Sequence, residues 1–316
     1  MNLNVVPIDQ THHRRVTAMS VRVWRPGYEL DLGSVLRPLR RGGGDPTYGR
    51  TPGGAVFRAT NTPCGPGTLA VRRVGDEVHA EAWGEGAEWL LDGLPALLGA
   101  ADDPTDFHAH HDIVAEARRA MPGLRLGSTG QVWDLLVPSI LEQKVTGMEA
   151  FRSFRELCLR FGVAAPGPLP LRVPPTPKAL MSITDWQWHK AGVDGARRRA
   201  LIAAAQVAGR LEKAAELKGA EGRALLRKVP GVGVWTAAEV AQRAWGDPDA
   251  VSFGDYHIPG NVGYALVGKP LDDAGMHEVL APYAPQRQRA VRYIEAAGIT
   301  KPRRGPRFSP RDYRAM

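Results

Sequence analysis

The chain has 316 residues, which is enough for about two domains with separate cores. A net charge of +8 and a pI near 9.7 favour a polyanionic partner. Two cysteines, Cys64 and Cys158, are too few for a disulfide framework or for the four thiolates of an iron–sulfur cluster.

No apolar run approaches the roughly 20 residues that span a membrane. The opening MNLNVVPIDQTHHRR also lacks the apolar core of a signal peptide. We therefore expect no membrane partner and a cytoplasmic location, in the cytosol or nucleoid of a bacterium.

The first hundred residues follow a period of two. Apolar and polar residues alternate over 19–23 and again over 77–82, which is typical of half-buried antiparallel strands. In the first of these strands, the alternation predicts a buried face made of Met19, Val21 and Val23. A single amphipathic helix is then predicted to close this region, with an apolar face of Ala87, Leu90, Leu91, Leu94 and Leu98.

Helical periods dominate after residue 105. The proline-rich stretch 165–175 is too short for a domain linker and predicts a rigid surface connection within the helical part. The segment 108–112 contains three histidines and an aspartate, but no second motif lies at zinc-like spacing. A polar loop that enters a helix is therefore favoured over a metal site.

Residues 224–245 predict two helices joined by a tight hairpin. In the second arm, a 3.6-residue period is formed by Val234, Ala237, Ala238, Ala241 and Trp245. Between the arms, Pro230 ends the first helix, while Gly231 and Gly233 permit positive φ angles and close backbone approach. A helix that begins at such a bare hairpin offers its N–H groups to a phosphate. The alternative is a plain turn between packed helices.

An isolated carboxylate, Asp255, follows the hairpin. Its local sequence indicates a helix N-cap, because Asp is favoured where a helix begins. A carboxylate at a fixed position can also stabilise a developing positive charge and orient or deprotonate water. The two roles are compatible, since a cap would fix the carboxylate on a rigid element.

The hairpin and this aspartate resemble the helix-hairpin-helix DNA glycosylase superfamily. Its members carry L-x-x-[VFL]-P-G-[VI]-G-x-x-T-A and then a catalytic aspartate, which this chain matches with Leu226, Val229, Pro230, Gly231, Val232, Gly233, Thr236, Ala237 and Asp255. A family helix with I-L-x-Q-x-V-[ST] is matched by Gln143, Val145 and Thr146. The chain looks most similar to 3-methyladenine DNA glycosylase II, because Trp235 stands where strand-cutting members place a Schiff-base lysine.

The resemblance implies an α+β fold. A small antiparallel β-rich (TBP-like) domain with a helix is expected at 1–104, an all-α helix-hairpin-helix glycosylase domain at 105–300, and a basic tail at 301–316. The implied activity is that of a monofunctional, 3-methyladenine-type DNA glycosylase, an N-glycosyl hydrolase that removes alkylated bases in base excision repair. Asp255 is the expected catalytic residue.

The resemblance also implies how DNA is held. The hairpin residues expected to contact the DNA backbone are Val229, Pro230, Gly231, Val232, Gly233 and Thr236. The carbonyls of Arg227, Val229 and Val232 would bind Na⁺ or K⁺, with no other cofactor. The expected partner is double-stranded DNA with damaged bases, bound by a monomer.

The base pocket needs an aromatic wall, because alkylated purines are often cationic and stack on electron-rich rings. We assign Trp235 and Tyr256 to this wall and Gln143 to the pocket. After Gln143, where related enzymes place an apolar wedge, this chain has Lys144, so no wedge is assigned.

The C-terminal segment concentrates positive charge. From Pro285 to the end, nine basic residues stand against Glu295 and Asp312, which gives +7. A solvated tail and a phosphate-tracking tail are both consistent with this composition. Two further functions remain open, namely a non-catalytic helix-hairpin-helix DNA-binding protein and a glycosylase for oxidised or mispaired bases.

Overall fold

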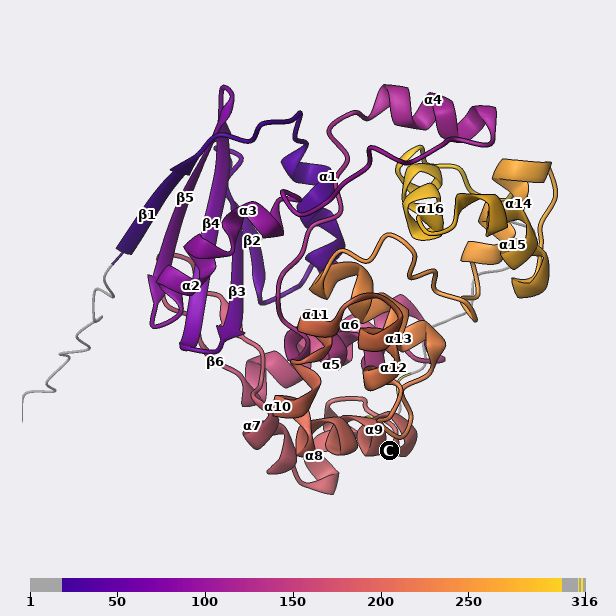
Figure 1. The fold of residues 1–316 in the computed structure, drawn as a ribbon. Coiled ribbons are helices and arrows are strands. Elements are labelled where there is room, and N and C mark those ends of the chain that lie inside the picture. The colour runs from indigo at the N-terminus through magenta and orange to yellow at the C-terminus, as the bar shows by residue number, and fades with distance from the viewer. Residues whose placement is uncertain (1–18, 303–311, 313, 315–316) are drawn as a thin grey trace, which may run out of the picture.

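The computed structural model describes residues 19–302 together with Asp312 and Arg314. A five-stranded sheet lies at one side of the molecule, and helices lie beside it (Figure 1). The expected α+β fold is therefore confirmed. None of the described helices has the length and apolar character that a membrane span requires.

The sheet has the strand order β1-β5-β4-β3-β2, and every neighbouring pair is antiparallel. Strands β2 to β5 form a meander, and β1 pairs with the outer edge of β5. The bounds are β1 (Met19–Trp24), β2 (Tyr48–Arg50), β3 (Val56–Thr62), β4 (Gly65–Val74) and β5 (Glu77–Gly84). One face packs against the short helices α1 (Leu32–Leu36), η1 (Arg37–Leu39), α2 (Ala87–Asp92) and α3 (Leu94–Leu97).

The predicted buried face of β1 is wrong. Met19, Val21 and Val23 are 54%, 64% and 57% exposed. The register explains this, because Arg22 lies opposite Ala80, and residues directly opposite each other share a face of the sheet. Ala80 is buried against the covering helices, so Arg22 also turns that way and donates to the Leu91 carbonyl of α2 at 2.7 Å.

The predicted closing helix is two helices. All five of its apolar residues are buried, as the period requires. However, α2 ends at Asp92 and α3 starts at Leu94, with Gly93 between them and Pro95 in the first turn of α3. Proline lacks the N–H that would continue the helical bonds of α2, so the apolar face is kept while the helix is interrupted.

The helical part contains two separate cores. The larger is built by α5 (Trp133–Leu141), α6 (Gly147–Phe161), α7 (Pro177–Met181), α8 (Asp185–Lys190), α9 (Gly195–Gln206), α10 (Ala208–Leu211), α11 (Ala214–Leu217), α12 (Gly219–Leu226) and α13 (Val234–Ala244). The second joins α4 (Asp112–Ala120) to α14 (Ile258–Val267), α15 (Asp273–Leu280), η2 (Ala281–Tyr283) and α16 (Arg287–Ala296). Figure 1 shows α4 beside α16, although much of the chain separates them.

The proline-rich stretch is more than the surface connection predicted from its sequence. It carries a two-stranded ribbon, β6 (Val163–Ala164) with β7 (Arg172–Val173), so the helical part is not purely helical. Between these strands, Leu169 and Leu171 pack on Phe57 and Trp83, which lie on the sheet face away from α2. The stretch therefore links the helical part to the sheet through apolar packing.

Candidate active site and nucleic-acid interface

The hairpin between α12 and α13 is anchored by its two valines. Val229 and Val232 are buried, while Pro230 and both glycines are exposed. Gly231 has φ +87°, and a Cβ there would lie 2.8 Å from the Cβ of Ala200 on α9. This position therefore requires glycine, for both its backbone angle and its close approach.

Gly233 serves a different purpose. Its φ is −92°, and a Cβ at this position would meet nothing within 4 Å. Gly233 is the N-cap of α13 and has no side chain to cap the first turn. The first N–H groups of α13 are thus presented at an open surface with the positive end of the helix dipole, which suits an anion. Val234, predicted to lie on the inner face, is 44% exposed here.

Gln143 belongs to the hairpin rather than to a pocket. Its Nε2 donates to the Gly231 carbonyl at 2.9 Å and to Thr236 Oγ1 at 2.8 Å. The amide thereby ties the end of α5 to the turn and to the first turn of α13. The next residue, Lys144, is exposed and has φ +54°, a conformation that few non-glycine residues adopt.

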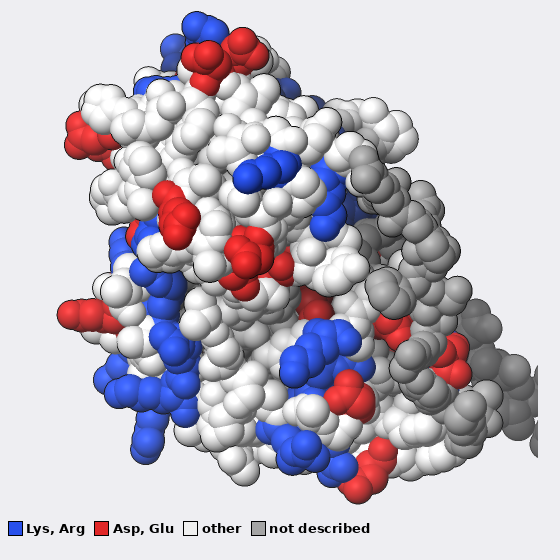
Figure 2. Space-filling view, turned by 90° about the vertical axis from the view of Figure 1, so that its right-hand side faces the viewer, with Lys and Arg blue, Asp and Glu red and all other residues white. Residues whose placement is uncertain are grey.

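Exposed basic residues surround the hairpin. Arg227 and Lys228 precede it, and Lys144 follows the glutamine that fixes it. Arg199 neighbours Ala200, which Gly231 approaches closely. Figure 2 shows one face of the molecule, with Lys and Arg side chains in a column along one edge and in groups over the lower half, and Asp and Glu among them. Such a surface suits a phosphate backbone.

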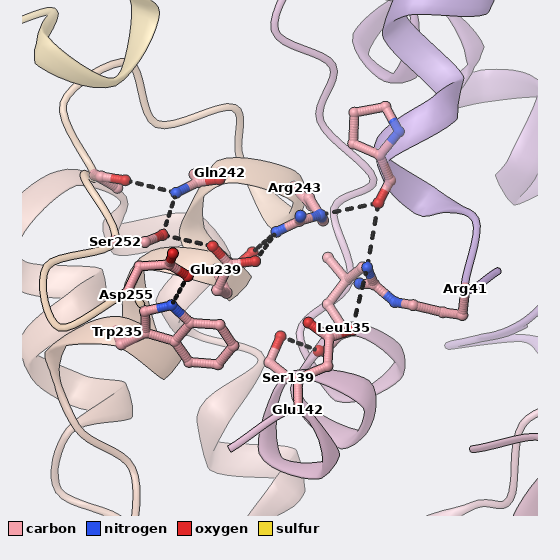
Figure 3. A network of polar contacts seen from close by, with 12 residues as sticks. Arg41, Leu135, Ser139, Glu142, Trp235, Glu239, Gln242, Arg243, Ser252 and Asp255 are labelled. Carbon is pink, nitrogen blue, oxygen red and sulfur yellow. Dashed lines mark hydrogen bonds and ion pairs between the residues drawn. The ribbon is translucent and has the colours of Figure 1, made fainter. Parts of the chain in front are cut away.

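Asp255 holds the start of a helix and faces a cavity, although the N-cap of that helix is His257 and not Asp255 as predicted. Its Oδ1 accepts the N–H groups of His257 at 2.7 Å and Ile258 at 2.9 Å, at the start of α14. Its Oδ2 accepts the Trp235 Nε1–H from α13 at 3.0 Å (Figure 3). Three donors thus fix the carboxylate between two helices and stabilise its negative charge.

The cavity has a volume of about 280 Å³ and lies where the three main cores meet. Its walls come from the η1 region, the segment 125–129, the end of α5, α13, the start of α14, and α16. Asp255 and Trp235 both line it. A carboxylate, an indole and enclosed space are therefore assembled from segments that are far apart in the sequence.

A polar network continues along the wall from α13 (Figure 3). Glu239 accepts from Arg243 at 2.8 Å and from the Ser252 hydroxyl. Arg243 also donates to the Pro38 carbonyl at 3.0 Å, and the negative charge of Glu239 keeps its pKa raised in spite of burial. Charged side chains are tolerated here because each has a close partner.

Glu142, at the end of α5, is the least satisfied acid of this wall. The nearest cation is Arg41, whose Nη1 lies 3.6 Å from Glu142 Oε1. Burial raises the pKa of the Glu142 carboxyl, Arg41 opposes this, and the negative charge of Glu239 adds to it. Among the described residues, Oε1 is buried and has no hydrogen-bond partner.

The structure separates the three predicted pocket residues. Trp235 lines the cavity, whereas neither Gln143 nor Tyr256 is part of its described lining. Tyr256 is 73% exposed, with its ring edge-on to His257 and 5.8 Å from Lys301 Nζ. The assignment of Tyr256 and Gln143 to a base pocket therefore stays a prediction.

Glu142, Glu239 and Arg243 are among the cavity residues that the sequence analysis did not single out. A signal existed for the pair on α13, because a Glu and an Arg four residues apart interrupt a run of small apolar residues. Glu142 fills the unspecified position of I-L-x-Q, so the motif gave no reason to single it out.

The charge assigned to the C-terminal segment is largely structural where it is described. Arg289 is fully buried and paired with Asp102 at 2.5 Å, Arg287 pairs with Asp249, and Arg292 with Glu295. These arginines of α16 bind internal acids and are not available to follow phosphates. Most of the tail 301–316 lies outside the described residues.

The histidine-rich segment makes protein contacts. His111 Nδ1 lies 2.8 Å from the Tyr283 hydroxyl, and His110 meets the same ring edge-on. Within the described ranges, no group of three or more His, Cys, Asp or Glu residues could hold a metal ion. His111 is the N-cap of α4, so the segment is a polar loop that enters this helix.

No family model matches the chain, and no curated protein matches its sequence. Solved structures share its fold. A 3-methyladenine DNA glycosylase from Archaeoglobus fulgidus matches with a TM-score of 0.71 and 15% identity, over 86% of this chain and 96% of that chain. The 8-oxoguanine glycosylase/lyase of Clostridium acetobutylicum matches with 0.67 and 13%, over 89% and 98%. Its complex with double-stranded DNA matches with 0.67 and 12%, over 89% and 97%.

Proposed function

We propose, from the fold that this chain shares with DNA glycosylases, that it is a monofunctional DNA glycosylase. It would flip a damaged base out of the duplex and hydrolyse its N-glycosidic bond. The observation that carries the proposal is the Asp255 carboxylate, held by three donors at the wall of a cavity of about 280 Å³. This volume is just below the range of small-molecule pockets, about 300 Å³ and above, and suits a single base.

Asp255 would act on the sugar. As the bond between C1′ and the base breaks, positive charge develops on the sugar ring, and a fixed carboxylate beside it stabilises that charge. The same carboxylate can accept the proton of the attacking water. Water is the co-substrate, and no cofactor is consumed. Flipping costs a few kcal/mol, and less where the pair is already weakened by damage.

The described lining supports a hydrolytic rather than a lyase reaction. It contains arginines but no lysine, and Trp235 beside Asp255 has no amine that could form a Schiff base. Release of the base by this site would therefore leave an intact strand with an abasic sugar.

Alkylated bases of the 3-methyladenine type are the substrates that the wall fits best. Three of its acids are neutralised by close arginines: Glu239 by Arg243, Glu295 by Arg292 and Asp247 by Arg223. Asp255 has no cationic partner among the described residues, so the charge beside Trp235 is negative. A cationic base would gain both stacking on the indole and attraction to this charge.

DNA would be held by the hairpin. The amides at the start of α13 and the surrounding Lys144, Arg199, Arg227 and Lys228 suit phosphates, which set position without reading sequence. The Val229 carbonyl accepts the Val232 N–H at 3.0 Å, so the carbonyls of Arg227, Val229 and Val232 share one tight turn. A Na⁺ or K⁺ ion held by these oxygens would add positive charge for a phosphate.

Removal of an oxidised base is the second candidate. The fold likeness to the 8-oxoguanine glycosylase/lyase, with a TM-score of 0.67, favours it. The absence of a lysine from the described cavity wall argues against the lyase part of such an activity. The further alternative, a DNA-binding protein without catalysis, gives no role to an enclosed carboxylate.

The test is base release from a panel of duplexes. Each would carry one 3-methyladenine, 7-methylguanine, hypoxanthine, 8-oxoguanine or undamaged adenine, and strand nicking and borohydride trapping would be followed together. We expect release of the methylated bases without nicking or trapping. Release of 8-oxoguanine alone would favour the second candidate, and tight binding without any release would favour the non-catalytic protein.

A further inference from the structure

We propose that Glu142 is a second catalytic residue of this cavity, which donates a proton to the departing base and so extends the substrate range to neutral bases. The inference rests on the proposed function and deepens it. Asp255 would stabilise the positive charge on the sugar, and Glu142 would protonate the base.

Geometry sets Glu142 apart from the other acids of the wall. It lines the same cavity as Asp255, and its side chain is only 18% exposed. Each of the remaining acids has a close donor: Glu239 and Glu295 have arginines at 2.8 Å, Asp247 has Arg223, and Asp255 has Trp235. Glu142 has only Arg41, at 3.6 Å.

The unpaired oxygen matters because buried polar atoms are normally satisfied. In the described part of the chain, Glu142 Oε1 has no hydrogen-bond partner, and its nearest cation is Arg41 at 3.6 Å. This atom is fully buried, so it is the exposed 18% of the side chain that can meet a base in the cavity. A base in the cavity would bring ring nitrogens and exocyclic oxygens that accept hydrogen bonds. A protonated carboxyl can donate to such an acceptor, whereas an ionised carboxylate can only accept.

The surroundings of Glu142 raise the pKa of its carboxyl. Burial raises the pKa of its carboxyl most, Arg41 and Arg243 oppose this, and the negative charges of Glu239 and Asp255 add to it. Arg125 and the Arg292–Glu295 pair line other parts of the same cavity. Asp255, by contrast, accepts hydrogen bonds from Trp235, His257 and Ile258. A carboxyl whose pKa is raised by burial can act as an acid beside a second carboxylate.

The chemistry explains why a second acid is needed. A cationic alkylated base leaves as a neutral molecule without help. A neutral base would leave as an anion unless it gains a proton as the bond breaks. In the proposed step, the Glu142 proton moves to a ring nitrogen of the base, the C1′–N bond breaks, and its electron pair stays on the base.

Water then closes the cycle. Its oxygen bonds to C1′ of the cationic sugar while Asp255 stabilises the charge, and its proton passes to Asp255. Solvent returns a proton to Glu142 and takes the one from Asp255. The sum is one water consumed, one neutral base released and one abasic sugar, with no oxidant or reductant.

The experiment compares one neutral and one cationic lesion with the full-length protein. Single-turnover release of hypoxanthine and of 7-methylguanine from otherwise identical duplexes would be measured for wild type, Glu142→Gln and Glu116→Gln, from pH 5.5 to 9. Glu116 is an exposed acid on α4, away from the cavity wall, and serves as the matched control. Melting temperatures would confirm folding, and Glu142→Asp would test the position of the carboxyl.

We expect Glu142→Gln to slow hypoxanthine release by about 100-fold and 7-methylguanine release by less than about threefold. Wild-type release of hypoxanthine should fall as the pH rises through the pKa of Glu142, because the donor loses its proton. That decline should be absent in Glu142→Gln. Glu116→Gln should match wild type on both lesions.

Other outcomes would overturn the proposal. Equal losses on both lesions in a folded variant would mean that Glu142 only shapes the cavity. A loss confined to 7-methylguanine would mean that it binds the cation as a carboxylate. If wild type releases 7-methylguanine but not hypoxanthine, the role of Glu142 fails while the proposed function stands. Release of no base at all would overturn both.

Discussion

Two buried polar networks in this molecule differ in how completely they are satisfied. At the junction of the sheet and α5, Asp134 accepts from the Thr60 hydroxyl and from the N–H and side-chain amide of Asn61, both at 2.8 Å. In the cavity, Glu142 has a buried oxygen without a partner among the described residues. Burial raises the pKa of both carboxyls.

The comparison teaches which network holds the fold and which is available for chemistry. Removing Asp134 would leave the Asn61 N–H without its acceptor. The Thr60 hydroxyl would keep Gln131 and the Asn61 amide would keep the Pro174 carbonyl, but the hydrogen bonds that link the sheet to α5 through Asp134 would be lost. Replacing Glu142 should cost little stability, because its side chain makes few interactions in the folded protein. A carboxyl that is buried but unsatisfied has capacity for a ligand that the satisfied one lacks.

The largest effect on stability is expected from Asp134→Ala. It removes three hydrogen bonds, leaves the Asn61 N–H without its acceptor, and should lower the free energy of unfolding by about 3 kcal/mol. Urea denaturation would measure this, with the excision rate followed in the folded fraction. A loss below about 1 kcal/mol would remove the distinction between the two networks.

The next effect concerns the hairpin. Gly233→Leu fits the backbone, because its φ of −92° is open to any residue and no atom lies within 4 Å of the added Cβ. It should weaken binding to all duplexes about tenfold, damaged or not, while the melting temperature stays unchanged. Fluorescence anisotropy would measure the affinities.

Gly231→Ala provides the contrast for this prediction. It meets both a φ of +87° and Ala200, so it should lower the melting temperature. If Gly233→Leu instead weakened binding to one lesion only, a hairpin that reads the backbone would be the wrong description.

A smaller effect is expected from Lys228→Gln beside the hairpin. Removing one phosphate contact should reduce the slope of log affinity against log salt by about 0.9. Binding titrations at salt concentrations from about 50 to about 200 mM would determine the slope, because phosphate contacts dominate the affinity in this range. Arg287→Gln is not a suitable control, because Arg287 forms an ion pair with Asp249. An unchanged slope for Lys228→Gln would mean that DNA does not bind beside the hairpin.

The smallest effect is the stability of Glu142→Gln. A carboxyl with a raised pKa in the folded state contributes stability below its unfolded pKa of about 4.3, and that contribution is lost as the pH rises through the folded pKa. The variant should therefore gain on wild type with rising pH, by no more than about 1 kcal/mol. Melting temperatures from pH 4 to 9 would show it, and a variant that loses stability at high pH would contradict the raised pKa.

The sequence predicted the parts of this fold that depend on local order. The tight turn at Gly231 between two helices and a helix that starts just after Asp255 follow from residue type and spacing alone, although the N-cap of α14 is His257. The sequence did not determine which face of β1 is buried, because the register with β5 decides it. The pairing of the α16 arginines also depends on acids that are distant in the chain.

The cavity shows the same limit. Trp235 could be assigned to it because it lies on the helix that starts at the hairpin. Glu142 could not, since the end of α5 reaches Arg41 and Glu239 only after three cores have come together. Residues placed by tertiary packing leave no periodic signal.

The most direct test of the account is single-turnover release of 7-methylguanine by wild type and Asp255→Asn, with duplex affinity measured on the same samples. Asparagine keeps an oxygen that can cap α14, so folding should be retained. We predict release by wild type, slowing by roughly 1000-fold or more in the variant, and affinities within about twofold of each other. Equal rates of release would contradict the assignment of Asp255 as the essential carboxylate.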